Sequence, residues 1–310
     1  MASLAQTKVS VARFLDGEVF FSFKSSPVTI AAFIVTSIII FMAIFAPVIA
    51  PHDPYNLLEL DIMVAFNPPV WYPDGSWEYM LGADDQGRDI LSAIVYGTRL
   101  SLWVGLVAVF FSGIIGVALG LLAGYVGGSV DAVIMRTAEI QLTFPAILIA
   151  LLIDGVLRGV LPPFMIEELA IWVVIVSIGI SGWPQYARTV RASTIVENRK
   201  EYVQAAVLTG IHPGLIMLRH VLPNVMGPVL VIATIQLAIA IINEATLSFL
   251  GVGIPVTEPS LGTLLRIGNN FLFSGEWWIT VFPGAMLAIL VIAVNLLGDW
   301  MRDVFNPKLR

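Results

Sequence analysis

Three polar side chains lie within one strongly apolar stretch of the sequence and are its first candidates for chemistry. Gln236, Asn243 and Glu244 are separated by seven and eight residues, so a helix would project all three from a similar side. Hydrocarbon solvates such groups poorly, so an ionisable residue within a membrane span faces, as a rule, a bundle interior or a water-filled path. We interpret these residues as candidates for a functional site. The alternative for Glu244 is a place near the outer interface, where it would be solvated or paired.

Motifs of catalysis are missing from the rest of the sequence. There is no GxxxxGK[ST] phosphate loop, no HExxH, no GxSxG and no cysteine. The three histidines, His52, His212 and His220, are far apart, and we interpret them as structural residues. We therefore expect a chain that is not an enzyme, with no catalytic residue, no metal ion and no cofactor of its own.

The composition places the chain in a membrane. Of its 310 residues 58% are hydrophobic and 12% are charged, which excludes a soluble globular domain and a disordered chain. A bilayer core needs about 20 apolar residues in helical form. Six stretches qualify: 28–50, 100–125, 133–157, 169–186, 225–249 and 278–297. We expect kinks in the third at Pro145 and in the fourth, which Gly179, Gly182 and Pro184 interrupt. The predicted class is an all-α integral membrane protein.

The distribution of basic residues predicts the orientation. With both termini inside, the inner segments hold 12 of the 16 Lys and Arg residues, as the positive-inside rule requires. We expect residues 1–27 to form a cytoplasmic tail, in which 11–23 is a candidate interfacial helix, and 28–50 to form the first span. Residues 51–98 would be an acidic external loop that is solvated, receives another protein or shields a pathway mouth. Residues 99–310 would form a five-helix core with a cytoplasmic loop at about 187–224.

A stripe of small residues in the second span predicts close packing. Ala108, Ser112, Gly116, Gly120 and Gly124 fall four apart, which lines them along one helix face and lets another helix approach at backbone distance. A flexible hinge is the alternative interpretation of the glycines.

The cytoplasmic loop predicts a short helical hairpin. Good helix formers from Glu201 onward stop at Gly210, which suits the position after a helix C-terminus. A second helix would begin at Pro213 and end after Leu222, before Pro223. It would present an apolar surface made of Leu215, Ile216, Leu218 and Val221. We expect this surface to dock a partner, the alternative being that it packs on its own bundle.

The same loop resembles the EAA loop of permease subunits in ATP-binding-cassette (ABC) importers. The matching runs are Gln204-Ala205-Ala206, Gly210 and His220-Val221-Leu222-Pro223-Asn224. Gln204 stands where many members have Glu, and Ile211 where Ala is commoner. Residues 81–89, 96–102, 244–251 and 295–307 are similar to the C-type subunit of the dipeptide/oligopeptide/nickel permeases. The resemblance implies a type I ABC importer permease fold and a coupling role for nine residues: Glu201, Gln204, Ala205, Ala206, Gly210, His220, Leu222, Pro223 and Asn224.

The resemblance also implies partners and a location. A B-type permease subunit would complete a pathway to which Gln236, Asn243 and Glu244 contribute. Two cytoplasmic ATPases would bind ATP and magnesium, and an external binding protein would deliver the solute. The chain would lie in the cell inner membrane, in contact with lipid and with no nucleic acid. Peptides are the expected solute, with nickel, sugars or another small solute as alternatives. A self-sufficient channel, an ion-coupled carrier and a membrane enzyme are the competing classes.

Overall fold

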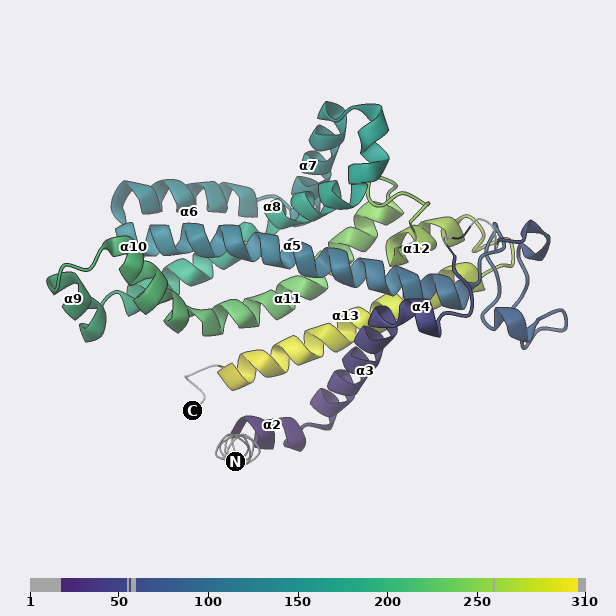
Figure 1. Cartoon of the computed structure of the whole chain (residues 1–310), viewed down its shortest axis with the longest axis horizontal. Coiled ribbons are helices and arrows are strands. Elements are labelled where there is room, and N and C mark those ends of the chain that lie inside the picture. Colours follow the sequence, from purple (N-terminus) through teal and green to yellow (C-terminus); the bar gives the residue numbers. More distant parts are fainter. Residues whose placement is uncertain (1–17, 55, 57–59, 259, 306–310) are drawn as a thin grey trace, which may run out of the picture.

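A computed structural model describes residues 18–54, 56, 60–258 and 260–305, which form a bundle of long helices (Figure 1). Within these ranges there is no strand, only one isolated bridge between Ala83 and Asp89. The elements in chain order are α2 (Glu18–Ser25), α3 (Pro27–Ile44), α4 (Ala46–Ile49), the 3₁₀ turns η1 (Ile62–Val64) and η2 (Trp77–Tyr79), α5 (Ile90–Val126), α6 (Gly128–Leu142), α7 (Ala146–Val160), α8 (Pro163–Glu197), α9 (Glu201–Leu208), α10 (Pro213–Ile216), the π turn η3 (Met217–Val221), α11 (Leu222–Phe249), α12 (Leu261–Asn269) and α13 (Trp278–Phe305).

The described residues contain five helices long and apolar enough to cross a membrane, or six if one bent pair is counted as a span. The bent pair is α6 and α7, whose axes differ by 97°. We predicted one kinked span over 133–157, and the structure instead breaks it into two helices. The break follows from Pro145, because a proline disfavours helical backbone in the residue before it and α7 starts directly after it.

The fourth span is longer than the sequence predicted. α8 runs over 35 residues from Pro163 to Glu197, and Pro184 lies inside this single helix. The predicted span 169–186 is therefore only its central part, and the polar residues after Tyr186 extend the helix instead of starting a loop. The charged end of α8 thus carries the chain directly to α9.

The stripe of small residues on α5 packs against α8, as predicted. All five residues are buried. A Cβ on Gly116 would lie 2.4 Å from the Cβ of Tyr186, and one on Gly120 would lie 2.6 Å from the carbonyl oxygen of Ala187. These positions admit no side chain, so the two helix backbones touch along this seam.

The two ends of the bundle differ in character. α9 and α10 lie at one end, together with α2 and the C-terminal end of α13 (Figure 1). The turns η1 and η2, the segment around them and α12 lie at the opposite end. The described segments nearest the two termini therefore share an end of the bundle with α9 and α10. Of the candidate interfacial helix 11–23, residues 18–23 belong to α2 and residues 11–17 lie outside the described residues.

Part of the predicted external loop is a packed block. The Asp84 carboxylate accepts hydrogen bonds from the backbone nitrogens of Gln86 and Arg88, both at 2.9 Å. Arg88 reaches the carbonyl oxygen of Val256 at 3.4 Å, and Asp89 caps the first turn of α5. Burial raises the pKa of Asp84, although the neighbouring Arg88 opposes the shift. Asp84, Arg88 and Asp89 are all buried, so a solvated loop is the wrong description for this stretch.

Candidate functional site

The first half of the predicted hairpin, from Glu201 to Gly210, has the expected form. α9 ends at Leu208, and Gly210 follows with a φ of +77°, a conformation that favours glycine. The nitrogen of Gly210 donates to the carbonyl of Val207 at 3.0 Å, and that of Ile211 donates to Ala206 at 3.2 Å. This pair of bonds is a Schellman motif, which satisfies the carbonyls left free at a helix end. The turn after α9 is therefore fixed by its backbone.

The second half of the hairpin differs from the prediction. We expected a helix that ends after Leu222, but α10, η3 and α11 form one continuous helical run from Pro213 to Phe249. Pro223 and Asn224 lie in the first turn of α11. Pro223 has no N–H to donate, and the wider π turn directly before it accommodates the missing bond. The hairpin is thus the end of a membrane span.

The apolar residues of the hairpin divide into two sets. Val203, Ala206, Ile216 and Val221 are buried in one cluster with the neighbouring parts of α5, α8 and α11. The other set faces outward: Leu208 is 88% exposed, Leu218 63%, Leu215 48% and Val207 47%. Ile216 and Val221, which we predicted at the surface, lie on the inner side because a helix that packs on the bundle must turn one face toward it. The hairpin therefore packs one apolar set against the bundle and exposes the other apolar set on its outer side.

A hydrogen-bond network ties α9 to both neighbouring helices. The Tyr202 hydroxyl donates to the Glu197 carboxylate and accepts from the Asn224 amide nitrogen at 3.1 Å. Asn224 also donates to the carbonyl of His220 at 2.6 Å, and Gln204 donates to Asn198 at 2.7 Å. Partial burial and then the bond to Glu197 raise the pKa of Tyr202 to about 12, so the phenol stays protonated.

Sequence reasoning singled out Asn224 and Gln204 but missed Tyr202 and Glu197. No short motif joins Tyr202 to Asn224, which lie 22 residues apart. Glu201, in the first turn of α9, and Ala205 are exposed. Leu222 is half-buried beside the hairpin cluster. The structure therefore gathers the nine predicted loop residues at one end of the bundle.

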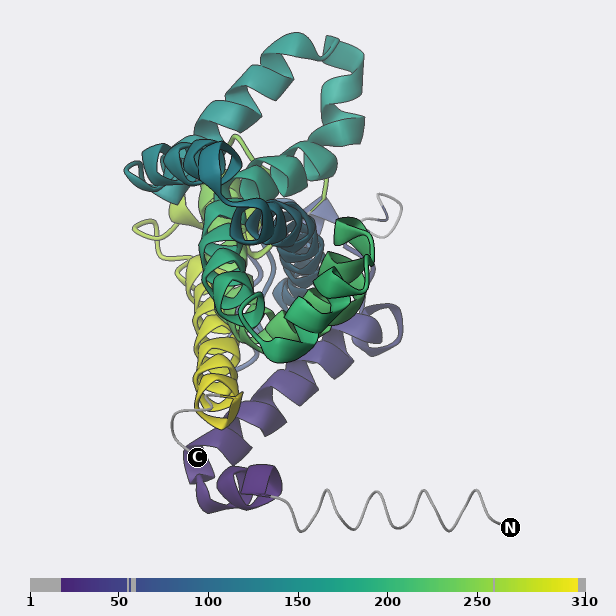
Figure 2. The same cartoon turned by 90° about the vertical axis from the view of Figure 1, so that its left-hand side faces the viewer.

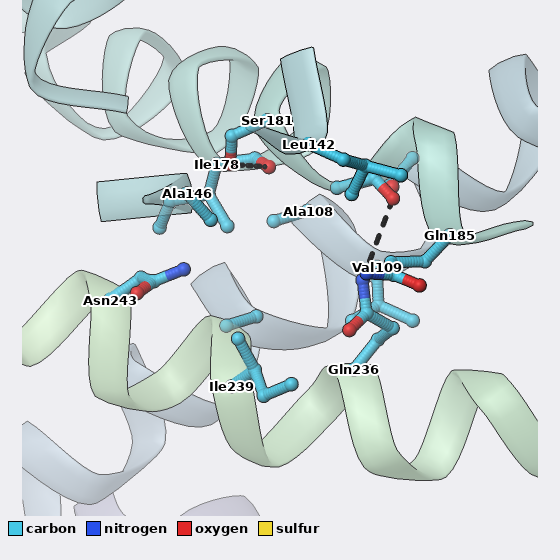
Figure 3. Close-up of a pocket in the computed structure, with 13 residues that line it drawn as sticks. Ala108, Val109, Leu142, Ala146, Ile178, Ser181, Gln185, Gln236, Ile239 and Asn243 are labelled. Atoms are coloured by element: carbon cyan, nitrogen blue, oxygen red, sulfur yellow. Dashed lines mark hydrogen bonds between the residues drawn. The ribbon is translucent and has the colours of Figure 1, made fainter. Parts of the chain in front are cut away.

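A cavity of about 120 Å³ lies between α5, α8, α11 and the α6–α7 break (Figure 3). Gln236 and Asn243 line it, and the Asn243 amide points into it. Gln236 donates to the carbonyl of Gly182 at a distance of 3.5 Å. The hydroxyl of Ser112 is buried at the cavity wall with no hydrogen-bond partner in the described residues. The polar groups of the wall are all uncharged: Ser112, Ser181, Gln185, Gln236 and Asn243.

Glu244, the third polar residue of the predicted set, does not line this cavity. Its side chain is fully buried and accepts hydrogen bonds from Ser101 at 2.7 Å and from Ser248 at 2.8 Å. The spacing of seven and eight residues was misleading, because Glu244 is rotated by 100° from Asn243 around the helix axis. Glu244 is enclosed by protein near the C-terminal end of α11. Glu244 instead joins α11 to α5.

The histidines have local contacts. His212 accepts a hydrogen bond from the backbone nitrogen of Gly214 at 3.2 Å, and His52 stacks on Tyr79 with ring centroids 5.2 Å apart. Among the residues that the structure describes, no group of three or more His, Asp or Glu side chains could hold a metal ion.

The helical bundle, its hairpin and its cavity define a multi-span membrane subunit, and sequence comparison gives its family. Residues 116–310 match the binding-protein-dependent transport system inner membrane component, and the chain belongs to this family. Residues 17–69 match the N-terminal TM domain of oligopeptide transport permease C. Together these matches bear out the resemblance drawn from the loop and the flanking motifs.

Curated relatives cover nearly the whole chain. A dipeptide transport system permease protein from Haemophilus influenzae is 37% identical over 293 residues, which is 94% of this chain and 95% of the relative. An oligopeptide transport system permease protein from Bacillus subtilis is 34% identical, over 93% of this chain and 88% of the relative. Among solved structures, an inward-facing MetNI methionine ABC transporter chain has a TM-score of 0.54 at 20% identity. It covers 70% of this chain and 98% of the other, and it shows a shared fold.

Proposed function

We propose that this chain is a permease subunit of an ATP-driven peptide importer in the cell inner membrane. The observation that carries the proposal is the α9–α10 hairpin, which is rigidly held yet presents an exposed apolar face. Such a face beyond the end of a membrane span is a surface for another protein, because water and lipid headgroups both solvate it poorly. Family membership and the peptide permease relatives support this assignment.

The proposed partners follow from the two ends of the bundle. With the basic segments inside, the hairpin end faces the cytoplasm, where Leu208, Leu215 and Leu218 would seat in a groove of an ATPase. A B-type permease would supply the second half of the pathway and carry a second ATPase. An external binding protein would deliver peptide to the opposite end, where the packed block around Asp84 and α12 lie. ATP hydrolysis belongs to the ATPases, and this chain is non-catalytic.

Coupling would run through α11. Closure of the two ATPases would move the hairpin, and the continuous run from Pro213 to Phe249 carries both the docking face and two cavity residues, Gln236 and Asn243. A displacement at one end therefore changes the cavity at the other. Turning such packed helices between two arrangements is a usual way to open a site to alternate sides of a membrane.

Peptide is the solute that the cavity and the relatives favour together. The amide and hydroxyl side chains of the cavity can donate hydrogen bonds to a peptide backbone and accept hydrogen bonds from it. Because none of these side chains is charged, no ion pair would hold the peptide in the cavity. Two relatives carry dipeptide or oligopeptide transport in their names. Nickel or sugars remain the competing solutes, which uptake measurements separate.

The docking face is tested by placing a charge on it. We expect Leu208→Glu to abolish co-purification of the ATPase with the permease and to stop peptide uptake, with normal membrane insertion. Phe273→Glu is the matched control, because Phe273 is 96% exposed at the opposite end. Retention of the ATPase by the Leu208→Glu complex would contradict the docking assignment.

The solute is tested separately in the native cells. We expect deletion of the gene to remove ATP-dependent uptake of labelled di- and oligopeptides, and re-expression to restore it. Unchanged peptide uptake in a strain without a second peptide importer would leave the docking role intact and move the solute to nickel or a sugar.

A further inference from the structure

A second, larger cavity lies against a different part of α5 from the uncharged cavity. It has a volume of about 350 Å³ and opens between α3 and α5. Its wall includes Thr36, Ile40 and Ile44 from α3 and Arg99, Trp103 and Leu106 from α5. We call this cavity the α3–α5 groove.

The α3–α5 groove and the uncharged cavity open on different sides of the bundle. The α5 residues that line the groove and those that line the cavity point, on average, in directions about 120° apart around the helix. The end-on view agrees, because α6 and α7 stand on one side of the bundle and α3 on the other (Figure 2).

One cation stands among the apolar residues of the groove. Arg99 is exposed, and among the described residues no carboxylate lies within ion-pair distance of it. Trp103, one helical turn farther along α5, is 55% exposed, and Ile44 at the C-terminal end of α3 is 62% exposed. Arginine and tryptophan one turn apart at the end of a span are typical of the level of lipid headgroups.

We propose that the α3–α5 groove binds an anionic phospholipid, with its phosphate on Arg99 and one acyl chain along Ile40 and Thr36. The guanidinium offers planar paired donors that match phosphate oxygens. From Ile44 to Thr36 the helix rises by about 12 Å, a length that an acyl segment can follow. Charge complementarity selects a lipid over an apolar protein segment. On the orientation proposed above, this lipid belongs to the outer leaflet.

The test uses the assembled transporter in nanodiscs and the fluorescence of Trp103. Phosphatidylglycerol or phosphatidylcholine, each brominated on its acyl chains, is titrated into a background of unbrominated phosphatidylcholine. The signal of Trp103 is the difference between the wild-type complex and the Trp103→Phe complex. We expect half-maximal quenching at about a fivefold lower mole fraction of phosphatidylglycerol, the preference that one basic residue near a membrane surface confers.

Three variants assign the preference to Arg99. Arg99→Gln should make the two lipids equal, and Arg99→Lys should keep part of the preference because the charge remains. Arg266→Gln, which removes an exposed arginine at the same end of the bundle, should leave it unchanged. Equal quenching by both lipids in the wild type would overturn the proposal. Absence of any Trp103 quenching would also overturn it, since a protein partner would then cover the groove.

Discussion

The hydroxyl of Ser101 on α5 lies 2.7 Å from a carboxylate oxygen of Glu244 on α11. The same hydroxyl accepts a hydrogen bond from the backbone nitrogen of Leu261, the first residue of α12, at 3.3 Å. One serine therefore joins three helices inside the bundle. Ser101 and Glu244 are both buried, so neither water nor lipid can replace these bonds.

Removing this hydroxyl should destabilise the fold. We expect Ser101→Ala to lower stability by about 1–3 kcal/mol, because it leaves a buried carboxylate oxygen and a backbone N–H without a partner. The measurement is the apparent melting temperature of the purified complex in detergent. Ser177→Ala is the control, since buried Ser177 donates only to the carbonyl of Val173 in its own helix. Equal melting temperatures for the two variants would contradict the role of Ser101.

The turn at Gly210 should tolerate only residues that accept a positive φ. Gly210→Val should reduce uptake at least about fivefold, because a β-branched residue in this conformation costs about 1–3 kcal/mol. A Cβ at this position would meet nothing within 4 Å, so crowding cannot be the cause. Gly210→Asn should retain much more activity, as asparagine adopts this conformation more readily. Uptake of labelled peptide, with membrane insertion checked, decides between them.

Close contact between the backbones of α5 and α8 can be tested with two glycines of α5, one of which serves as the control. Gly116→Ala should destabilise the protein by about 1–3 kcal/mol, because its Cβ would lie 2.6 Å from the backbone oxygen of Trp183. Gly113→Ala, three residues away, should be neutral or slightly stabilising, since its Cβ would meet Tyr186 at an ordinary 3.8 Å. Thermal unfolding of both variants tests this, and equal losses would refute backbone contact at the seam.

The uncharged cavity should matter for transport and not for assembly. We expect Asn243→Leu to reduce peptide uptake several-fold while the ATPase still co-purifies, because the variant loses only a polar group that faces the cavity. Thr246→Val on the same helix is the control, as its hydroxyl bonds within α11 and it does not line the cavity. If Thr246→Val impaired uptake as strongly, the effect would belong to α11 in general.

Local patterns predicted much of this architecture. The apolar stretches located the five long apolar helices and the bent pair, the four-residue spacing predicted the seam at Gly116, and Gly210 predicted the end of α9. Each of these features depends on residues close together in the sequence. Local backbone geometry determines these features, so contacts between residues far apart in the sequence change them little.

The remaining features depend on distant contacts. Pro145 predicted a kink within one span, but not two separate helices whose axes differ by 97°. The partner of Glu244 is 143 residues away, and no local pattern indicates it. Pro223 is a usual helix stop, and only the π turn before it explains why the helix continues.

The continuity of α10, η3 and α11 has a mechanical consequence. The run has 37 residues and is about 55 Å long, so a tilt of about 4° displaces one end by about 4 Å relative to the other. A flexible joint between the hairpin and the span would absorb part of such a stroke. In this chain the backbone is helical throughout this run, with a π turn before Pro223, so under the proposed coupling α11 would act as a stiff lever whose stroke increases with its length.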